Sequence, residues 1–323
     1  MSPEAATVQA ALVDARDLHV KVGPAEAVRG VSLALTAGVR TGLIGESGSG
    51  KTLTALALMG LLPQGLTASG SVRFEGRELL GLGERERARL RGSAMGMIFQ
   101  EPLTALDPLQ RIGDAIAEPL RQHRGLKAAA AREQALQLLD RVQMPDAREK
   151  LRAYPHQLSG GQRQRAMIAM AIACGPRLLI ADEPTTALDV TVQAGILELL
   201  TRLVEDRGMS LLLITHDLAV VSETCGEVNV MYGGTLVETG SVDEVFSRPR
   251  HPYTVGLLDA IPPVDQPIAG RRLAAIPGLV PGLGEFPDGC PFRNRCARAD
   301  ARCAELPTLQ GDGHRVACWH PVP

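Results

Sequence analysis

The chain has 323 residues, 45% hydrophobic and 22% charged, which is typical of a folded globular protein. Its formal net charge of −2 provides no broad basic field, so nucleic acid is not an expected partner. Its longest apolar runs fall far short of the roughly 20 residues of a membrane-spanning helix. The N-terminus lacks the basic start and apolar stretch of a secretory signal. We therefore expect a protein that stays in the cytoplasm, where thiols are kept reduced.

The first informative segment predicts a phosphate-binding loop between a strand and a helix. VRTGLIG, at 39–45, is a short apolar strand, GESGSGKT follows at 45–52, and the next residues favour a helix. Glycines in such a turn let backbone N–H groups converge on one point at the positive end of the helix. Lys51 is placed to reach the β- and γ-phosphates, and the Thr52 hydroxyl to ligate Mg²⁺. The nucleotide-contacting residues predicted here are Gly45, Ser47, Gly48, Ser49, Gly50, Lys51 and Thr52.

Two further apolar strands end in polar residues suited to phosphate chemistry. RLLIADEP, at 177–184, places Asp182 to hold magnesium and Glu183 to orient or deprotonate an attacking water. SLLLITHD, at 210–217, ends near His216, for which we predict a contact with the γ-phosphate. Alone, the carboxylates would fit an acidic turn and the histidine a structural role. Together with the phosphate loop, they favour a nucleotide site.

Strands that alternate with helices predict an α/β fold, a mixed or parallel sheet wrapped by helices. In such folds ligands bind beyond the carboxyl ends of the strands, where all three motifs fall. The segment at 190–206 has helical spacing and contributes to the core. The apolar residues that share its face are Val192, Ile196, Leu199, Leu200 and Leu203.

LSGGQRQRAMIAMAIA, at 158–173, predicts a small polar turn that opens an alanine-rich helix. Its serine and glycines present backbone N–H groups at a helix start, which makes a second anion site on the same chain. One nucleotide rarely needs two such sites from one chain. The economical explanation is a dimer in which this loop closes over the partner's ATP.

At this point the sequence resembles the ATP-binding subunits of ABC transporters. GESGSGKT, Gln100 in MIFQEP, LSGGQ, LLIADEP, ALD at 187–189 and ITHD occur in that family's order. The resemblance implies a P-loop NTPase core, a helical subdomain that meets membrane subunits, and ATP hydrolysis coupled to transport. It implies that Gln100 touches Mg²⁺ and senses the membrane subunits, that Asp189 signals across the dimer and that His216 holds the γ-phosphate. The residues that it assigns to the partner's ATP are Ser159, Gly160, Gly161 and Gln162.

One position departs from the family pattern. The family usually stacks an aromatic residue on adenine near the N-terminus, whereas this chain has Val22 there and no aromatic residue before Phe74. Stacking of a base on an aromatic ring is worth about 1–3 kcal/mol in nucleic-acid systems. We expect weaker affinity or selectivity for adenine, with Val22 giving only apolar contact.

The C-terminal part narrows the resemblance to the peptide/nickel class of ABC importers. HPYT at 251–254 and the CPFRNRC stretch that begins at Cys290 look like that class. The function implied is import of dipeptides or oligopeptides, with nickel or another small solute as an alternative. A non-transport ABC ATPase, such as one for iron–sulfur assembly, is the second alternative. The predicted parts are the ATP-binding core at 1–94, the helical subdomain with the signature at 95–165, the rest of the core at 166–250 and the C-terminal extension at 251–323.

The resemblance also implies partners, because a chain without a predicted membrane span cannot form a path for a solute. These partners are two transmembrane permease subunits, a second ATPase subunit and an extracytoplasmic solute-binding protein. A different chain is the first choice for the second ATPase, and another copy of this chain is the second. The expected location is peripheral, at the cytoplasmic face of the cell membrane.

Four of the six cysteines lie in the tail, with C-x5-C-x6-C-x14-C spacing: Cys290, Cys296, Cys303 and Cys318. A reducing compartment disfavours disulfides, and the absence of a C-x2-C pair weakens a zinc ribbon. Four thiolates are the normal complement of a [4Fe–4S] cluster, which some members of the resembled class carry here. We predict the cluster, while zinc and free thiols stay open.

Three arginines lie beside these cysteines: Arg293, Arg295 and Arg298. They would offset the thiolate charge or form a solvated basic loop. We expect the tail to act as a metal-bound staple at some distance from the ATP chemistry. The two other cysteines, Cys174 and Cys225, read as ordinary buried thiols.

Overall fold

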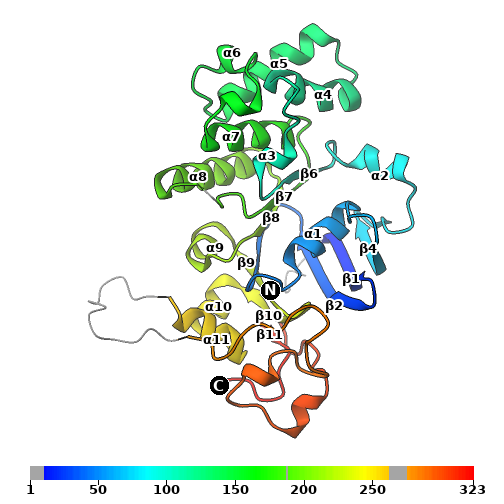
Figure 1. Cartoon of the computed structure of the whole chain (residues 1–323), viewed down its shortest axis with the longest axis vertical. Helices are drawn as coiled ribbons and strands as arrows, with labels where there is room; N and C mark the ends of the chain where they lie inside the picture. The colour runs from blue at the N-terminus through cyan, green and yellow to red at the C-terminus, as the bar shows by residue number, and fades with distance from the viewer. Residues whose placement is uncertain (1–10, 187, 262–274) are drawn as a thin grey trace, which may run out of the picture. The chain divides into compact units, whose positions relative to one another are not determined.

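A computed structural model describes residues 11–186, 188–261 and 275–323 of the chain (Figure 1). The chain forms two compact units. Of the described residues, the first comprises 11–14, 33–40, 72–186 and 188–213, and the second comprises 15–32, 41–71, 214–261 and 275–323. Ala187, in the predicted ALD motif, lies outside the described residues. Among the helices that are described, none has the length and apolar character needed to cross a membrane.

Three long strands near the N-terminus each contribute residues to both units. They are β1 (Ala11–Val22), β2 (Ala25–Thr36) and β4 (Leu66–Phe74). With β5 (Arg77–Glu78) they form a sheet in the order β2-β1-β4-β5. In β1 the buried Leu18 and Val20 are separated by the half-buried His19, which gives the sheet one apolar face.

In the first unit, three fully buried strands lie in the order β8-β7-β6: β6 (Met95–Ile98), β7 (Leu178–Asp182) and β8 (Ser210–Ile214). β6 and β7 are parallel, with Met95 opposite Leu178. Burial on both faces explains why these strands read as continuous apolar runs. The predicted strands at 177–184 and 210–217 are therefore confirmed, each shorter than its motif.

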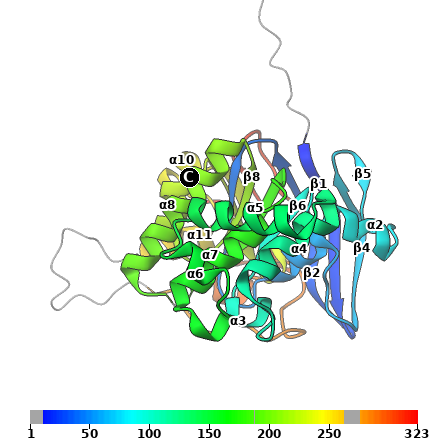
Figure 2. The same cartoon turned by 90° about the horizontal axis from the view of Figure 1, so that it is seen from above.

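The helices of the first unit include a group that Figures 1 and 2 show side by side, α4, α5 and α7. Ile112, Ile116 and Leu120 recur every four residues on α4 and are all buried, so this face packs inward. On α8 the predicted apolar face is buried except at Val192, which is half-buried. The helices are α2 (Glu84–Leu90), α3 (Pro102–Ala105), α4 (Ile112–Arg124), α5 (Ala128–Arg141), α6 (Ala147–Lys150), η1 (Pro155–Gln157), α7 (Gly160–Ala171) and α8 (Val190–Arg207).

In the second unit, the strand order is β11-β10-β9-β3, with β3 (Arg40–Ile44), β9 (Glu227–Tyr232), β10 (Thr235–Ser241) and β11 (Arg315–Val316). β3 and β9 are parallel, whereas β10 is antiparallel to both β9 and β11. The predicted strand at 39–45 is thus confirmed as β3, and together the elements confirm a mixed α/β fold. The helices here are α1 (Lys51–Met59), α9 (Leu218–Thr224), α10 (Val242–Ser247), α11 (Pro252–Asp259), η2 (Arg293–Arg295) and η3 (Ala301–Ala304).

Candidate functional site

The predicted phosphate loop joins β3 to α1 in the second unit, and its glycines adopt backbone conformations that other residues rarely take. Gly45, Gly48 and Gly50 have φ of +151°, +78° and +98°. A Cβ on Gly45 would lie 2.1 Å from the carbonyl oxygen of Met231, and one on Gly50 would lie 2.8 Å from that of Ala27. Neighbouring backbone thus closes against the loop at two points, which only glycine permits.

Lys51 is buried at the base of this loop, with 5% of its surface exposed. Its Nζ donates to the carbonyl oxygens of Gly45 and Glu46, at 2.8 and 3.0 Å, and to Ser49 Oγ at 3.4 Å. These three contacts within the phosphate loop therefore fix the position of the ammonium group. The adjoining Thr52 and Ser47 side chains are exposed, so a ligand can reach them.

A cavity of about 260 Å³ opens beside the phosphate loop. Ser47 and Gly48 line it together with the β9–β10 turn at Gly233 and Gly234. The C-terminal extension supplies another wall, from Val280 to Leu283 and at Phe286. In the same unit Val22 ends β1 and is half-buried. His216 follows β8 and is exposed.

In the first unit, the predicted base Glu183 and the predicted metal contact Gln100 lie together. Gln100 Nε2 donates to Glu183 Oε2 at 3.2 Å, and Thr186 Oγ1 donates to the same oxygen at 2.8 Å. Glu183 has φ +43°, in the left-handed region. Asp182, the last residue of β7, is 2% exposed. Two polar side chains thus fix the orientation of one carboxylate just beyond the end of the strand.

The signature loop opens α7 with a reciprocal cap. Ser159 Oγ accepts from the backbone N of Gln162 at 3.3 Å, and Gln162 Oε1 accepts from the backbone N of Ser159 at 3.0 Å. Gly160 lines a cavity of about 380 Å³ with Gln100 and Thr186. Within this unit, the signature loop and the residues around Glu183 therefore face one space. Gly161 follows in the first turn of α7.

Asp189 caps α8, because its Oδ1 accepts from the backbone N of Val192 at 3.0 Å. This contact orders the start of the helix.

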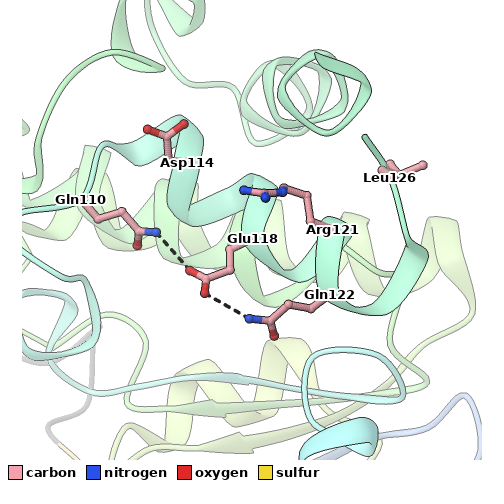
Figure 3. Close-up of a pocket in the computed structure, with 6 residues that line it drawn as sticks. All are labelled: Gln110, Asp114, Glu118, Arg121, Gln122 and Leu126. Atoms are coloured by element: carbon pink, nitrogen blue, oxygen red, sulfur yellow. Dashed lines mark hydrogen bonds between the residues drawn. The ribbon is translucent and has the colours of Figure 1, made fainter. Parts of the chain in front are cut away.

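A larger cavity of about 550 Å³ lies along α4 (Figure 3). Glu118 occupies its centre and accepts hydrogen bonds from Gln110 Nε2 at 3.0 Å and Gln122 Nε2 at 3.1 Å. Asp114 and Arg121 of the same helix complete a charged lining. The predicted helical subdomain therefore carries a polar, hollowed surface.

The four tail cysteines line one small cavity in the second unit: Cys290, Cys296, Cys303 and Cys318. All six cysteines of the chain are described, and all are free thiols. Burial, together with a smaller contribution from the neighbouring cysteines, raises the pKa of Cys290 to about 11. Cys174 and Cys225 are buried, as predicted.

His251, from the HPYT motif, also lines the cysteine cavity. Its Nδ1 accepts from the backbone N of Tyr253 at 3.1 Å, so the proton of the neutral ring lies on Nε2. That Nε2 is buried without a hydrogen-bond partner in the described structure. Burial lowers the pKa of His251 to about 3, which keeps the ring neutral. The described part of the chain thus leaves this N–H donor without an acceptor at the cavity.

Among the described residues, the only group compact enough for a single ion is Asp300, Cys303 and His320, whose ligand atoms lie within 4.8 Å of one another. No three of the tail cysteines meet that limit. Tetrahedral zinc with bonds of about 2.3 Å would hold sulfurs about 3.8 Å apart. A cluster spaces its thiolates more widely, because each sulfur binds a different iron. The described cysteines therefore do not form a compact single-ion site among themselves.

Arg298 lies beside the thiols as predicted, since it lines their cavity. Burial raises the pKa of Cys296 and of Cys318, and the charge of Arg298 opposes that rise. For Arg295 the prediction is wrong. Arg295 is only 9% exposed and forms an ion pair with Glu46 of the phosphate loop, at 2.6 Å. Arg295 does not belong to a solvated basic loop, because its guanidinium is paired with the half-buried carboxylate of Glu46. The tail therefore touches the phosphate loop directly instead of lying at a distance from the ATP chemistry. Sequence reasoning also missed Tyr253, whose hydroxyl accepts from the backbone N of Glu46 at 2.8 Å.

Comparisons with known proteins identify the family of the chain. The family model described as ABC transporter matches residues 28–186, and the model described as Oligopeptide/dipeptide transporter, C-terminal region matches residues 237–303. The chain is 46% identical to the Oligopeptide transport ATP-binding protein OppD of Salmonella typhimurium, covering 99% of this chain and 96% of that protein. It is 45% identical to the Probable D,D-dipeptide transport ATP-binding protein DdpD of Escherichia coli, covering 96% and 97%.

Among solved structures, the chain resembles the ATP-binding cassette MJ0796, in a dimeric post-hydrolysis state bound to ADP and Pi. The TM-score is 0.63 and the identity 28%, over 71% of this chain and 98% of that one. The fold is thus that of an ABC ATPase. From its phosphate loop to its C-terminal extension, the chain belongs to the family of ABC transporter ATP-binding subunits, in the branch that carries the oligopeptide/dipeptide transporter C-terminal region.

Proposed function

We propose that this chain hydrolyses ATP to drive the import of dipeptides or oligopeptides through a membrane transporter. The proposed substrate class rests on sequence similarity along the whole chain. Relatives named for oligopeptide and D,D-dipeptide transport are 46% and 45% identical to it. These names favour peptides over nickel or another small solute. The matched C-terminal region favours a transporter over a non-transport ABC ATPase.

The chemistry assigned to the chain is transfer of the γ-phosphoryl group of ATP to water. The phosphate loop, with Lys51 fixed inside it, binds the phosphates. Glu183 takes the proton of the attacking water as its oxygen bonds to phosphorus and the bond to ADP breaks. His216 contacts the γ-phosphate, and Val22 gives apolar contact to adenine. Asp182, Gln100 and the Thr52 hydroxyl would hold Mg²⁺, which prefers oxygen ligands, and the ion would neutralise phosphate charge.

The remaining site residues act between subunits in this proposal. Ser159, Gly160, Gly161 and Gln162 complete the ATP site of a second ATPase subunit, and Asp189 signals between the two. A different chain is the preferred second subunit. Two transmembrane permease subunits and an extracytoplasmic solute-binding protein complete the importer, with this chain peripheral at the cytoplasmic face of the membrane.

The helical subdomain proposed at 95–165 meets the permeases, and the hollowed surface along α4 is a candidate contact (Figure 3). The other proposed parts are the core at 1–94 and 166–250 and the extension at 251–323.

The test of hydrolysis is the variant Glu183→Gln in the assembled transporter. Loss of a general base lowers turnover by about 10²-fold or more, so ATP should stay bound while peptide uptake stops. Both ATP turnover and uptake of a labelled tripeptide are measured in vesicles. Glu198→Gln, on α8, serves as the matched control. Unchanged turnover in Glu183→Gln would remove this residue from the mechanism.

We also propose that the four tail cysteines hold a [4Fe–4S] cluster. Their shared cavity, their spacing and the unpartnered His251 Nε2–H fit such a group, whose sulfur atoms accept hydrogen bonds. The cluster supplies a covalent staple for a tail with little core of its own. Zinc and free thiols are the competing occupancies.

The cluster test is iron and sulfide analysis of the full chain purified without oxygen. We expect about four of each per chain, and loss of most iron in Cys303→Ser. Cys174→Ser, which changes a buried thiol of the first unit, should keep its iron. A colourless, iron-free chain, or one that contains only zinc, would contradict the cluster.

A further inference from the structure

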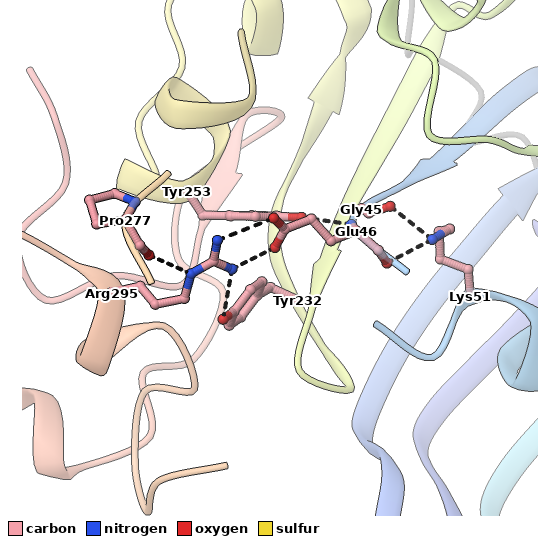
Figure 4. Close-up of polar contacts among 7 residues, drawn as sticks. All are labelled: Gly45, Glu46, Lys51, Tyr232, Tyr253, Pro277 and Arg295. Carbon is pink, nitrogen blue, oxygen red and sulfur yellow. Dashed lines mark hydrogen bonds and ion pairs between the residues drawn. The ribbon is translucent and has the colours of Figure 1, made fainter. Parts of the chain in front are cut away.

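The side chain of Arg295, in the cysteine-bearing tail, donates hydrogen bonds from all three of its nitrogens next to the phosphate loop (Figure 4). Its Nη1 and Nη2 donate to the two carboxylate oxygens of Glu46, at 2.6 and 3.2 Å. Nη1 also donates to the hydroxyl of Tyr232 at 3.2 Å, and Nε donates to the carbonyl oxygen of Pro277 at 2.8 Å. A planar guanidinium held on three sides can take one orientation only, and it imposes that orientation on the carboxylate.

Glu46 is the second residue of GESGSGKT, and each of its polar groups has a partner in Figure 4. Its backbone N donates to the Tyr253 hydroxyl at 2.8 Å, and its carbonyl oxygen accepts from Lys51 Nζ at 3.0 Å. The side chain is bound to Arg295, as above. A path of direct contacts thus runs from the tail arginine, through one loop residue, to the lysine that meets the phosphates.

The cysteine turn itself determines where Arg295 lies. The backbone N of Arg295 donates to the Phe292 carbonyl at 2.9 Å, and that of Cys290 donates to the Cys303 carbonyl at 3.0 Å. Arg295 immediately precedes Cys296, so the thiols flank it on both sides in sequence. Although burial alone would lower the pKa of Arg295, hydrogen bonds to Glu46 and Tyr232 raise it, and the group stays charged.

We propose that Arg295 is a positioning residue for the phosphate loop, and that the four-cysteine tail sets the affinity for ATP through its ion pair with Glu46. The pair fixes Glu46 in the loop, and the carbonyl oxygens of Gly45 and Glu46 hold Lys51. When the pair is lost, the loop and its lysine sample other conformations, and ATP binding must order them again. The effect falls on binding, because neither residue touches the reacting atoms. The inference rests on the proposed ATP-binding function.

The experiment compares ATP hydrolysis by the full chain in the assembled transporter. The variants are Arg295→Gln, Glu46→Gln, the double variant and Arg295→Lys. Arg302→Gln, which removes an exposed arginine from the neighbouring turn η3, is the matched control. KM for MgATP and kcat are measured separately for each, together with the thermal unfolding midpoint.

We expect Arg295→Gln to raise KM about 10-fold, with kcat changed less than about 2-fold. The KM of the double variant should be no higher than that of either single variant, because both substitutions remove the same interaction. The KM of Arg295→Lys should lie between those of the unsubstituted chain and Arg295→Gln, since an ammonium keeps the charge but cannot form the bidentate pair. A purely structural brace would lower the unfolding midpoint without this selective change in KM.

A KM for Arg295→Gln within about 2-fold of that for Arg302→Gln would overturn the inference, as would multiplicative losses in the double variant. If Arg295→Gln does not assemble, Glu46→Gln decides, since it leaves the Arg295 contacts with Tyr232 and Pro277 in place. Its KM must then rise for the inference to stand. Failure of the unsubstituted chain to hydrolyse ATP would refute the proposed function instead.

Discussion

Glu183 lies in the left-handed backbone region, at φ +43°, where a non-glycine residue is under strain. Such conformations cost about 1–3 kcal/mol and persist where surrounding contacts determine them. Here the contacts are the hydrogen bonds from Gln100 and Thr186 to one carboxylate oxygen. Together, the turn and these two hydrogen bonds hold the carboxylate in one orientation just beyond the end of β7. This orientation is what the proposed role as a general base requires.

Lys51 offers the most direct test of the phosphate loop at this scale. Lys51→Ala removes the ammonium that meets the phosphates and frees the loop carbonyls that it holds. We expect the affinity for MgATP to fall at least 10-fold, since a buried charge-assisted contact is worth about 1.5–3 kcal/mol. Equilibrium binding of a fluorescent ATP analogue to the full chain measures the loss.

The control for this prediction is Lys21→Ala, which removes a half-exposed lysine of the same unit near the end of β1. Its effect on ATP binding should stay within about 2-fold. Normal nucleotide binding by Lys51→Ala would show that the loop at 45–52 is not the phosphate site.

At the scale of elements, α9 begins next to His216 because Asp217 caps it. Its Oδ1 accepts from the backbone N of Ala219 at 2.9 Å and of Val220 at 3.3 Å. We expect Asp217→Ala to lower the free energy of unfolding by about 1 kcal/mol. Hydrolysis should fall as well, because the residue that precedes the cap loses its fixed position. Asp217→Asn retains a capping oxygen and should behave like the unsubstituted chain. Urea unfolding and ATP turnover are measured on the unsubstituted chain, Asp217→Ala and Asp217→Asn. An equal loss of stability in the two variants would show that the charge of Asp217 matters and that its capping oxygen does not.

Elements with a strong local pattern were predictable. The apolar runs of β3, β7 and β8 are buried throughout or nearly so, and the glycine-rich and serine-glycine turns fall at the helix starts where their residue types indicate. The two-residue β11 was not predictable, because its pairing with β10 depends on backbone groups and not on a side-chain pattern. The short turns η2 and η3 were also missed, because three or four residues are too few to show a hydrophobic period.

At the scale of the whole molecule, motifs identified the individual site residues but not every contact between distant segments. The pairing of Gln100 with Glu183 could have been anticipated, because the family resemblance assigns both to one reaction. The Arg295–Glu46 pair could not, since its members are 249 residues apart and no periodicity links them. Arginines beside cysteines suggested charge balance with the thiols, and only the fold shows that Arg295 pairs instead with the half-buried carboxylate of Glu46.

That separation has a consequence for how the protein matures. Ribosomes add about 5–20 residues per second, so Arg295, 249 positions after Glu46, is added roughly 10–50 s later. Throughout that interval the nascent phosphate loop lacks its partner from the tail. Nucleotide therefore meets an incompletely braced loop until the last segment has emerged and folded. A newly made chain therefore lacks the Arg295–Glu46 contact until its C-terminal segment has been synthesised and has folded.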